Sequence, residues 1–249
     1  MARYFLEISY NGTPYHGWQR QPNAITIQQV LEEKLSTILR STIHIVGAGR
    51  TDTGVHAKQI MAHFDFVDQL ETDKLVYKMN SILPAEIAIQ KIKLVPPEAH
   101  ARFDATSRCY EYLISLKKDP FLIRNAYYVK KPLDLDVMNK AANILLNHTN
   151  FKCFSKSKTD VKTYNCNIAE AFWKKEGDVL VFRIRADRFL RNMVRAITGT
   201  LLEVGSGKRK VADMHEIIES KNRSNAGVSV PAKGLYLTQV KYPNSIFDE

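Results

Sequence analysis

The stretch HIVGAGRTDTGVHA, residues 44–57, holds a single aspartate, Asp52, between a glycine-rich turn with Arg50 and a strand-like segment. No other Asp or Glu lies within ten positions of Asp52 on either side. Hydrolysis of a glycosidic bond usually needs two carboxylates, one as acid and one as base or nucleophile. The question is therefore which chemistry one displayed carboxylate can perform alone.

The neighbours of Asp52 allow four interpretations. An Asp-Thr-Gly tripeptide begins at Asp52, as in aspartic proteases, but a second such tripeptide is missing and Arg50 disfavours a shared proton. Gly47 and Gly49 begin a dinucleotide fingerprint whose third glycine is replaced by Asp52. A turn-forming aspartate is physically sound. The fourth interpretation is a nucleophile or electrostatic catalyst that an arginine holds ionised.

The fourth interpretation suits chemistry at C1′ of a nucleoside. An oxocarbenium-like centre develops there, and one carboxylate can stabilise it or attack it. A uracil base can leave as a delocalised anion, so a second acid is dispensable. No water needs activation if the base adds again through another atom.

The spacing after Asp187 predicts a long helix with two different faces. The apolar face contains Leu190, Met193, Val194, Ile197 and Leu201. The opposite, cationic face contains Arg188, Arg191, Asn192, Arg195 and Gly199. Because no acidic residue is interleaved on this face, it favours an anionic partner over a merely solvated surface.

Further basic residues are candidates for contacts with an RNA backbone. They are Arg20, Lys152, Lys156, Lys158, Lys162, Lys208, Arg209 and Lys210. A metal site is not expected, because the three cysteines form no C-x-x-C pair and the seven histidines form no H-x-x-x-H pair.

The elements that must position these residues repeat one order. The first half predicts strands over 3–10, 58–66 and 86–94, a short strand before Asp52, and helices over 26–39 and 73–83. The second half predicts strands over 109–116, 178–186 and 234–242, a further strand within 166–175, and helices over 136–149 and from Asp187 onward. Thr26 and Gln29 fit a capping box for the first helix. The number of residues from Tyr4 to Tyr110 is nearly the same as the number from Thr51-Asp52 to Thr159-Asp160, which indicates that the second half repeats the first.

Each half therefore has the order βαββαβ of ferredoxin-like folds. We expect an α+β fold of two ferredoxin-like, RRM-like halves, residues 1–104 and 105–249. We expect the halves to join in one mixed, largely antiparallel sheet with a central basic cleft, because no Pro/Gly/Ser-rich linker separates them.

Composition narrows the class of partner. The 249 residues carry a formal net charge of +10, and the pI is about 9.4, which favours a polyanion such as RNA. The sequence shows no long apolar run and no signal-peptide pattern at its start, so we expect a cytoplasmic protein without a membrane partner.

Several blocks resemble the tRNA pseudouridine synthase A family. GRTDTGVHA (49–57) is similar to the catalytic motif of that family. The other similar blocks follow in family order: YNGTPYHGWQRQ (10–21), LPAEIAI (83–89), HARFDATSRCYEYLI (100–114), RADRFLRNMVRAITGTLLEVG (185–205) and AKGLYLTQVKYP (232–243). The resemblance covers nearly the whole chain. The departures from the family pattern, at Asn11, Arg188 and Arg191, lie outside the motif around Asp52.

The resemblance implies an isomerase that converts uridines 38, 39 and 40 of the tRNA anticodon stem-loop to pseudouridine. It implies a homodimer that needs no cofactor and no metal. It makes Asp52 the catalytic aspartate in the first half. In the second half it makes Tyr110 the tyrosine that contacts uracil and Arg195 the basic partner of Asp52. Arg50 is expected to bind substrate.

The alternative is a non-catalytic protein with two RRM-like domains. It would explain the charge and the sheet pattern. It would not explain the G-R-T-D turn, and the sequence contains no RNP1-like run.

Overall fold

The computed structural model describes residues 1–157 and 161–247, and the chain forms two compact units. The first unit is Met1–Thr106 with Tyr236–Glu249, and the second is Ser107–Leu235. The division expected from sequence, after residue 104, falls close to the first of these boundaries. The last residues, expected in the second half, belong to the first unit.

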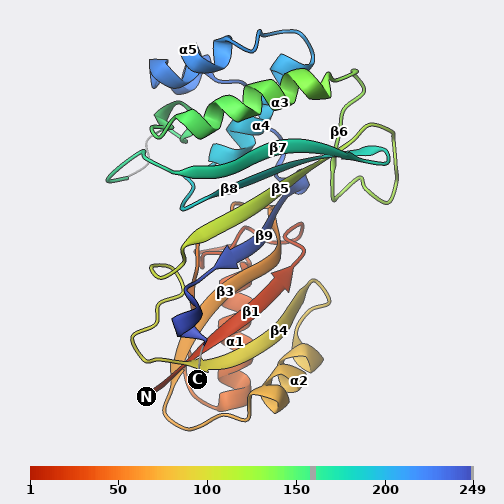
Figure 1. Ribbon diagram of the computed structural model, residues 1–249. Helices are drawn as coiled ribbons and strands as arrows, with labels where there is room; N and C mark the ends of the chain where they lie inside the picture. Colours follow the sequence, from red (N-terminus) through yellow and green to blue (C-terminus); the bar gives the residue numbers. More distant parts are fainter. Residues whose placement is uncertain (158–160, 248–249) are drawn as a thin grey trace. The chain divides into compact units, whose positions relative to one another are not determined.

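The first unit has the ferredoxin-like element order. Its elements are β1 (Ala2–Tyr10), α1 (Ile27–Leu39), β2 (Val46–Gly47), β3 (His56–Phe66), α2 (Thr72–Ile82) and β4 (Ile87–Val95) (Figure 1). The strands pair in the order β4-β1-β3-β2, and each of these pairs is antiparallel. This is the arrangement of two interlocked split βαβ units. Helix α2 packs against β4 and contacts α1.

Helix α1 follows directly from its sequence. The Thr26 hydroxyl accepts a hydrogen bond from the Gln29 amide at 3.3 Å, which confirms the predicted cap. Ile27, Leu31 and Leu35 recur at helical spacing and are buried. The helix runs over Ile27–Leu39, as predicted.

The C-terminal segment completes the first unit. Strand β9 (Leu235–Lys241) pairs in parallel with the start of β3, His56 opposite Tyr236. Beyond the strand, the Tyr242 hydroxyl donates to the Ala101 carbonyl at 2.5 Å, and its ring meets Phe5 edge-on. These contacts explain why the end of the chain belongs with its beginning.

The second unit has a similar sheet under more helices. Its elements are β5 (Ser107–Ser115), β6 (Tyr127–Tyr128), α3 (Leu135–Ile144), β7 (Ile168–Glu176), β8 (Val179–Ala186), α4 (Met193–Gly205) and α5 (Asp213–Ser220), with short 3-10 turns between them. Strand β8 pairs antiparallel with both β5 and β7, and the short β6 pairs in parallel with β5. Helix α3 packs on β7 and contacts α4, and α5 lies beyond α3 (Figure 1). With β9 following in the chain, the order is again βαββαβ, with β6 and α5 added, so the fold class is α+β, as predicted.

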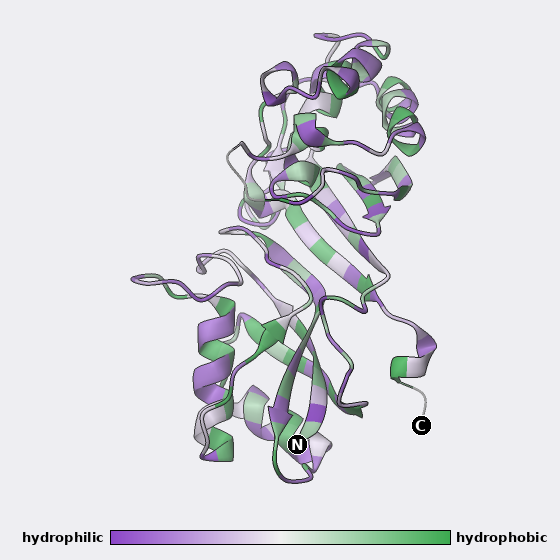
Figure 2. Cartoon of the chain, turned by 90° about the vertical axis from the view of Figure 1, so that its left-hand side faces the viewer, coloured by the Kyte–Doolittle hydropathy of each residue, from purple (hydrophilic) through white to green (hydrophobic). Residues whose placement is uncertain are grey.

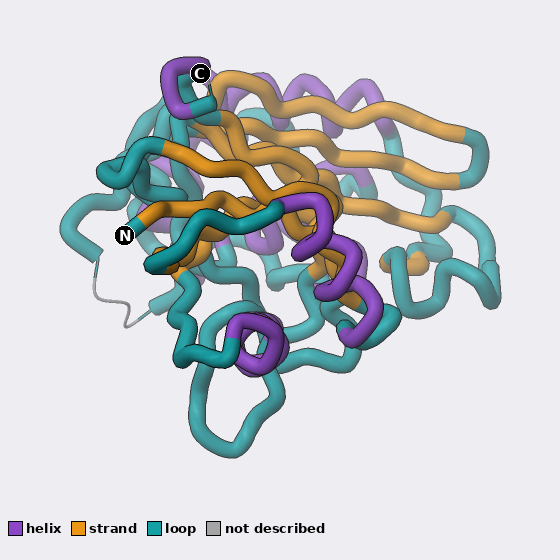
Figure 3. The backbone as a smooth tube through the Cα atoms, turned by 90° about the horizontal axis from the view of Figure 1, so that it is seen from below, coloured by secondary structure: helices purple, strands orange, loops and turns teal. Residues whose placement is uncertain are grey.

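Hydropathy follows burial along these elements. In Figure 2 apolar and polar residues alternate along the strands and share the helices, as expected where one face is buried. In β5, for example, Tyr112 and Ile114 are buried, while Glu111 and Leu113 are partly exposed. Long loops join several of the elements (Figure 3).

The helix predicted from Asp187 begins later than expected. Asn192 has a left-handed φ of 66°, and α4 starts at Met193. The Asp187 carboxylate accepts backbone N–H bonds from Asn167 and Arg188, which holds this stretch as a loop. The predicted apolar stripe is buried, but the cationic face does not exist as one helix face. Gly199 is buried in α4, and of the basic residues assigned to this face only Arg195 lies in the helix.

Two predictions lie outside the described residues, namely the Thr159-Asp160 repeat and the candidate Lys158. Across the described helices, none combines the length and apolar character needed to cross a membrane.

Candidate active site

Asp52 lies in a tight turn between β2 and β3. The Val55 amide donates to the Asp52 carbonyl at 3.1 Å, and Gly54 takes a positive φ of 75° within this turn. Thr51 is buried, Asp52 is half-buried, and Arg50 is exposed. The turn therefore presents the one carboxylate at the edge of the first unit's core, with a cation two residues away in the chain.

The loop of residues 11–18 holds this turn from the other side. The Trp18 amide donates to the Thr51 carbonyl at 3.1 Å, and the Gly54 amide donates to the Tyr15 carbonyl at 3.3 Å. The hydroxyls of Tyr10 and Thr51 are 2.7 Å apart and buried. Because backbone groups make most of these bonds, the position of Asp52 is fixed by main-chain geometry.

Two glycines permit this close approach. A Cβ added to Gly12 would lie 2.0 Å from the Val55 carbonyl oxygen, and one added to Gly17 would lie 2.5 Å from the Thr51 carbonyl oxygen. Gly17 also has a φ of 86°, a conformation that other residues rarely adopt. Larger residues at either position would push the Asp52 turn away.

His56 fastens the end of the turn. Its Nδ1 accepts the Gly12 N–H at 3.2 Å, which places the proton of the neutral ring on Nε2. The ring is buried and stacks on Tyr236 at 4.5 Å between centroids. Burial raises the pKa of the Tyr236 hydroxyl to about 12, so that phenol stays protonated at neutral pH.

The second unit holds Arg195 in the first turn of α4. Its Nε donates to the Val230 carbonyl at 2.8 Å, and the Val230 amide donates to the Arg195 carbonyl at 3.2 Å. The neighbouring Pro231 carbonyl accepts the Tyr112 hydroxyl at 2.7 Å. Burial raises the pKa of Tyr112 well above its usual range, and the positive charge of Arg195 opposes that rise. The segment 230–231 thus holds Arg195 through its Nε and Tyr112 through its hydroxyl.

Tyr110 lies on β5 and is half-buried. Its ring meets Phe189 edge-on, with centroids 5.1 Å apart and planes at 89°. Alternation along the strand puts it on the same face as Arg108, which donates to the Asp187 carbonyl at 2.8 Å, and Tyr112. The stretch before α4 therefore borders this face of β5, where Phe189 meets Tyr110 and Asp187 binds Arg108.

Comparison with known proteins adds an independent observation. The family model described as tRNA pseudouridine synthase matches residues 8–104 and 141–243. The chain belongs to this family. Those ranges include the Asp52 turn, the loop 11–18 and Arg195, whereas Tyr110 lies between them.

Named relatives match over their full lengths. The protein called tRNA pseudouridine synthase A of Parabacteroides distasonis is 52% identical, over 99% of this chain and 98% of its own length. The protein of the same name from Bacteroides fragilis is 51% identical, over 100% of this chain and 99% of its own length. The one from Caldicellulosiruptor bescii is 41% identical, over 97% of this chain and all of its own. The protein is therefore an isomerase, a pseudouridine synthase that modifies tRNA.

The predicted RNA-binding cations of this tRNA pseudouridine synthase differ in their surroundings. Arg20 pairs with the buried carboxylate of Glu32 at 3.1 Å, and Arg209 pairs with Glu203 at 2.5 Å. Both charges are thus partly neutralised within the protein. The lysines among the described candidates are exposed: Lys152, Lys156, Lys162, Lys208 and Lys210.

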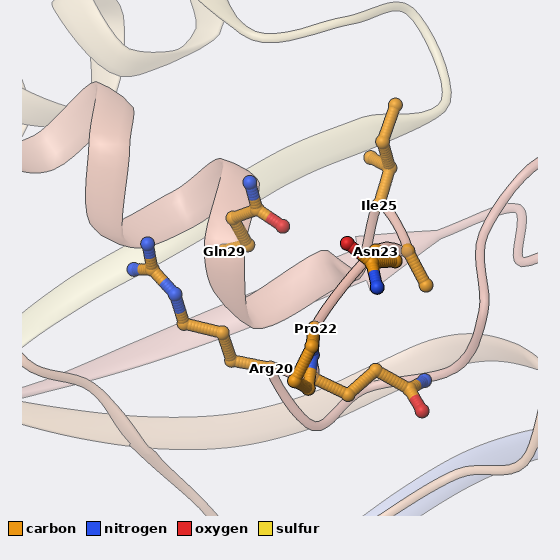
Figure 4. A pocket seen from close by; sticks show the side chains of 7 residues that line it. Arg20, Pro22, Asn23, Ile25 and Gln29 are labelled. Atoms are coloured by element: carbon orange, nitrogen blue, oxygen red, sulfur yellow. The ribbon is translucent and has the colours of Figure 1, made fainter.

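A shallow pocket lies beside Arg20, at the tip of the loop before α1. Its volume is about 570 Å³, and Figure 4 shows its lining. Two amides of the lining are already engaged: that of Gln29 donates to Glu33, and that of Gln21 donates to the His16 carbonyl. We assign no ligand to this pocket.

The described part of the chain contains no cluster of three or more His, Cys, Asp or Glu side chains that could hold a metal ion. The three cysteines are buried, and burial raises the pKa of Cys153 and Cys166 to about 12. They behave as small apolar residues and not as nucleophiles.

Sequence reasoning missed the residues that hold Asp52 in place. Gly12, Gly17 and Trp18 lie in the block 10–21, which sequence reasoning marked only as similar to the family, and His56 received no role. One signal was available, because two glycines flank buried aromatics in that loop. Nothing in the local sequence of the loop or of the Asp52 turn indicates that these two segments contact each other.

Proposed function

We propose that this synthase converts uridines 38, 39 and 40 of the tRNA anticodon stem-loop to pseudouridine, with Asp52 as its catalytic carboxylate. We further propose that it works as a cytoplasmic homodimer without metal or cofactor. The observation that carries the proposal is that half-buried Asp52 lies in a turn held by main-chain bonds, within a family match to tRNA pseudouridine synthases. The name shared by the relatives supports the choice of substrate.

The reaction is balanced without any added reagent. The N1–C1′ bond of the uridine breaks, and a C1′–C5 bond forms after the base turns. C5 then loses its proton and N1 gains one. Because substrate and product are isomers, the protein has to supply only binding, charge stabilisation and proton transfer.

In this scheme Asp52 promotes cleavage of the N1–C1′ bond. Its carboxylate either attacks C1′ or removes the C2′ proton. Uracil departs as a delocalised anion, so the site needs no second carboxylate. A fixed main-chain position for Asp52 suits this role, because catalysis depends steeply on the placement of the reacting group.

Tyr110 and Arg195 serve the base and the carboxylate in this proposal. Tyr110 contacts the uracil and helps to remove or relay the C5 proton. Arg195 holds Asp52 ionised through a charge-assisted hydrogen bond, and Arg50 contributes to binding the substrate. The Nε bond of Arg195 to Val230 supports an orienting role, because it fixes the guanidinium before substrate arrives.

The target uridine lies in a stacked stem and has to be flipped out, at about a few kcal/mol. Contacts between the basic surface and the RNA backbone offset that energy. Affinity for tRNA should therefore fall steeply as salt increases.

The test uses tRNA labelled with tritium at C5 of uridine. Wild-type protein should release tritium, whereas Asp52→Asn should release none and still bind tRNA within a few-fold of wild type. Asp68→Asn, which changes an exposed aspartate of the same unit, is the matched control and should keep full activity. Appreciable release by Asp52→Asn would refute the assignment, and no release by wild type would leave only an RNA-binding protein.

A second measurement tests the tRNA positions. Pseudouridine is mapped in total tRNA from cells that lack this chain. Loss confined to positions 38–40 supports the proposal, and loss elsewhere contradicts it. Light scattering of the purified protein tests the homodimer.

A further inference from the structure

The loop of residues 117–131, which joins β5 to α3 and contains β6, exposes large apolar side chains. Phe121 is 89% exposed and Ile123 is 60% exposed. In Figure 1 this loop projects from the sheet beside β6. Large apolar side chains that are exposed together on one short loop indicate an interaction surface.

The loop is held in one conformation. The Asp119 carboxylate accepts the Phe121 N–H at 2.8 Å, and the Ala126 N–H donates to the Leu122 carbonyl at 2.8 Å. Ala126 is buried, and the following residues pair with β5. Because the backbone is already ordered, binding through Phe121 would lose little conformational entropy.

The charge of this loop is mostly positive, although Lys117 pairs with Asp178 of the turn between β7 and β8 at 2.9 Å. The loop's basic residues are Lys117, Lys118, Arg124, Lys130 and Lys131, and its one acidic residue is Asp119. All five basic residues are exposed. A second copy of this chain carries the same +10 net charge, so this surface is more complementary to a polyanion.

The loop is also tied to the segment that holds Arg195. The Lys233 ammonium donates to the Ile123 carbonyl at 2.7 Å. Two and three residues earlier, Pro231 and Val230 bind Tyr112 and Arg195. The loop segment that contains Phe121 and Ile123 and the Arg195 guanidinium are thus both hydrogen-bonded to the same short stretch, residues 230–233.

We propose that the 117–131 loop is a tRNA-binding element in which Phe121 stacks on an unpaired base while the flanking cations contact phosphates. The inference rests on the proposed function, because it assigns a further contact to the same substrate. Aromatic side chains between cations are a common platform for bases outside a helix. Ile123 supplies apolar contact beside the stacked ring.

The experiment compares three variants in tRNA binding at fixed salt. Phe121→Ala should raise Kd by about 5- to 150-fold, the range expected for losing one base–aromatic stack. Phe121→Trp should bind within a few-fold of wild type, because it keeps a stacking surface. Tyr77→Ala removes a 76% exposed aromatic of α2 and should leave Kd unchanged.

The cations are tested separately. Lys118→Gln with Arg124→Gln should lower the slope of log Kd against log salt, because fewer phosphate contacts release fewer counterions. Single-turnover rates at saturating tRNA should stay within about threefold of wild type in each variant, because the loop acts on binding.

Unchanged binding by Phe121→Ala would overturn the proposal. So would a fall in molar mass of Phe121→Ala by light scattering, which would make this loop a contact between copies of the chain. Because Kd is measured directly, the result stands apart from the proposed function, whose failure would appear as wild-type protein that binds tRNA and forms no pseudouridine. Phe121 is almost fully exposed, so its removal should leave the melting temperature unchanged.

Discussion

Replacing Gly17 by alanine should displace the turn that carries Asp52, our proposed catalytic residue, without unfolding the protein. The added Cβ would lie 2.5 Å from the Thr51 carbonyl oxygen, and such contacts essentially never fall below 3.0 Å. The loop and the turn must therefore separate by about half an ångström, if all the strain is relieved there. Asp52 follows Thr51 directly and moves with it.

The expected effect has two parts that can be separated. The left-handed φ of Gly17 makes alanine unfavourable by about 1–2 kcal/mol, which lowers the free energy of unfolding. The shift of Asp52 should lower kcat by about 10- to 100-fold, because a displacement of about 1 Å in an active site can reduce the rate about 100-fold.

Two control variants separate strain from displacement. Gly177→Ala places alanine at a φ of 59° with no atom within 4 Å of the new Cβ, so it should reduce stability and leave kcat unchanged. Gly49→Ala lies three residues before Asp52, also with open space around the Cβ, and should change neither quantity. Urea unfolding and single-turnover pseudouridine formation are measured for all three. If Gly17→Ala loses stability but keeps kcat within twofold of wild type, the loop does not position Asp52.

Four further predictions concern single side chains. His56→Asn keeps an acceptor near Nδ1 for the Gly12 amide and should retain more activity than His56→Gln, as steady-state kcat will show. Burial lowers the pKa of His63 to about 4, so as pH falls from about 6.5 the unfolded chain takes up a proton at this residue before the folded protein does. The free energy of unfolding should therefore fall by up to about 1.4 kcal/mol per pH unit between pH 6.5 and 4. His63→Gln should reduce this slope, as urea titrations over the same pH range will show. Cys153 and Cys166 should react with a thiol reagent only after unfolding, which absorbance at the reagent's wavelength follows; rapid reaction of the native protein would contradict their burial. Arg195→Lys keeps the charge but loses the fixed guanidinium plane, so a clear loss of kcat is expected, and full activity would argue against an orienting role.

Local patterns predicted most of the elements. Helix α1 could be placed at both ends, because Thr26 caps it and the apolar residues keep helical spacing through it. Strands β1 and β8 alternate buried and partly exposed positions over several residues, so their period of two can be recognised. Asp52 could be chosen as a candidate for a similar reason, since its unusual feature is the composition of the residues around it in the sequence, and its role stays a prediction.

The start of α4 could not be predicted, because the apolar stripe begins at Leu190, about one turn before the first residue of the helix, Met193. Leu190 is buried like the helical positions that follow it, yet Asn192 adopts a left-handed φ and breaks the helix there. The deciding interactions are tertiary: Asp187 bonds to Asn167 and to Arg108. Spacing reports which residues are buried, and it cannot report whether burial is achieved in a helix or a loop.

The loop that holds Asp52 shows why a single carboxylate can be positioned without neighbouring acids. Its contacts come from residues 11–18, roughly forty positions earlier, and they are made largely by backbone groups. Every residue type offers backbone donors or acceptors, so such contacts do not require particular residues. The exceptions are positions where the two segments lie too close together to leave room for a side chain. Gly12 and Gly17 mark those two places. A turn held in this way depends on glycines that leave room for the backbone to approach, and its most sensitive substitutions should lie at those glycines as well as at Asp52.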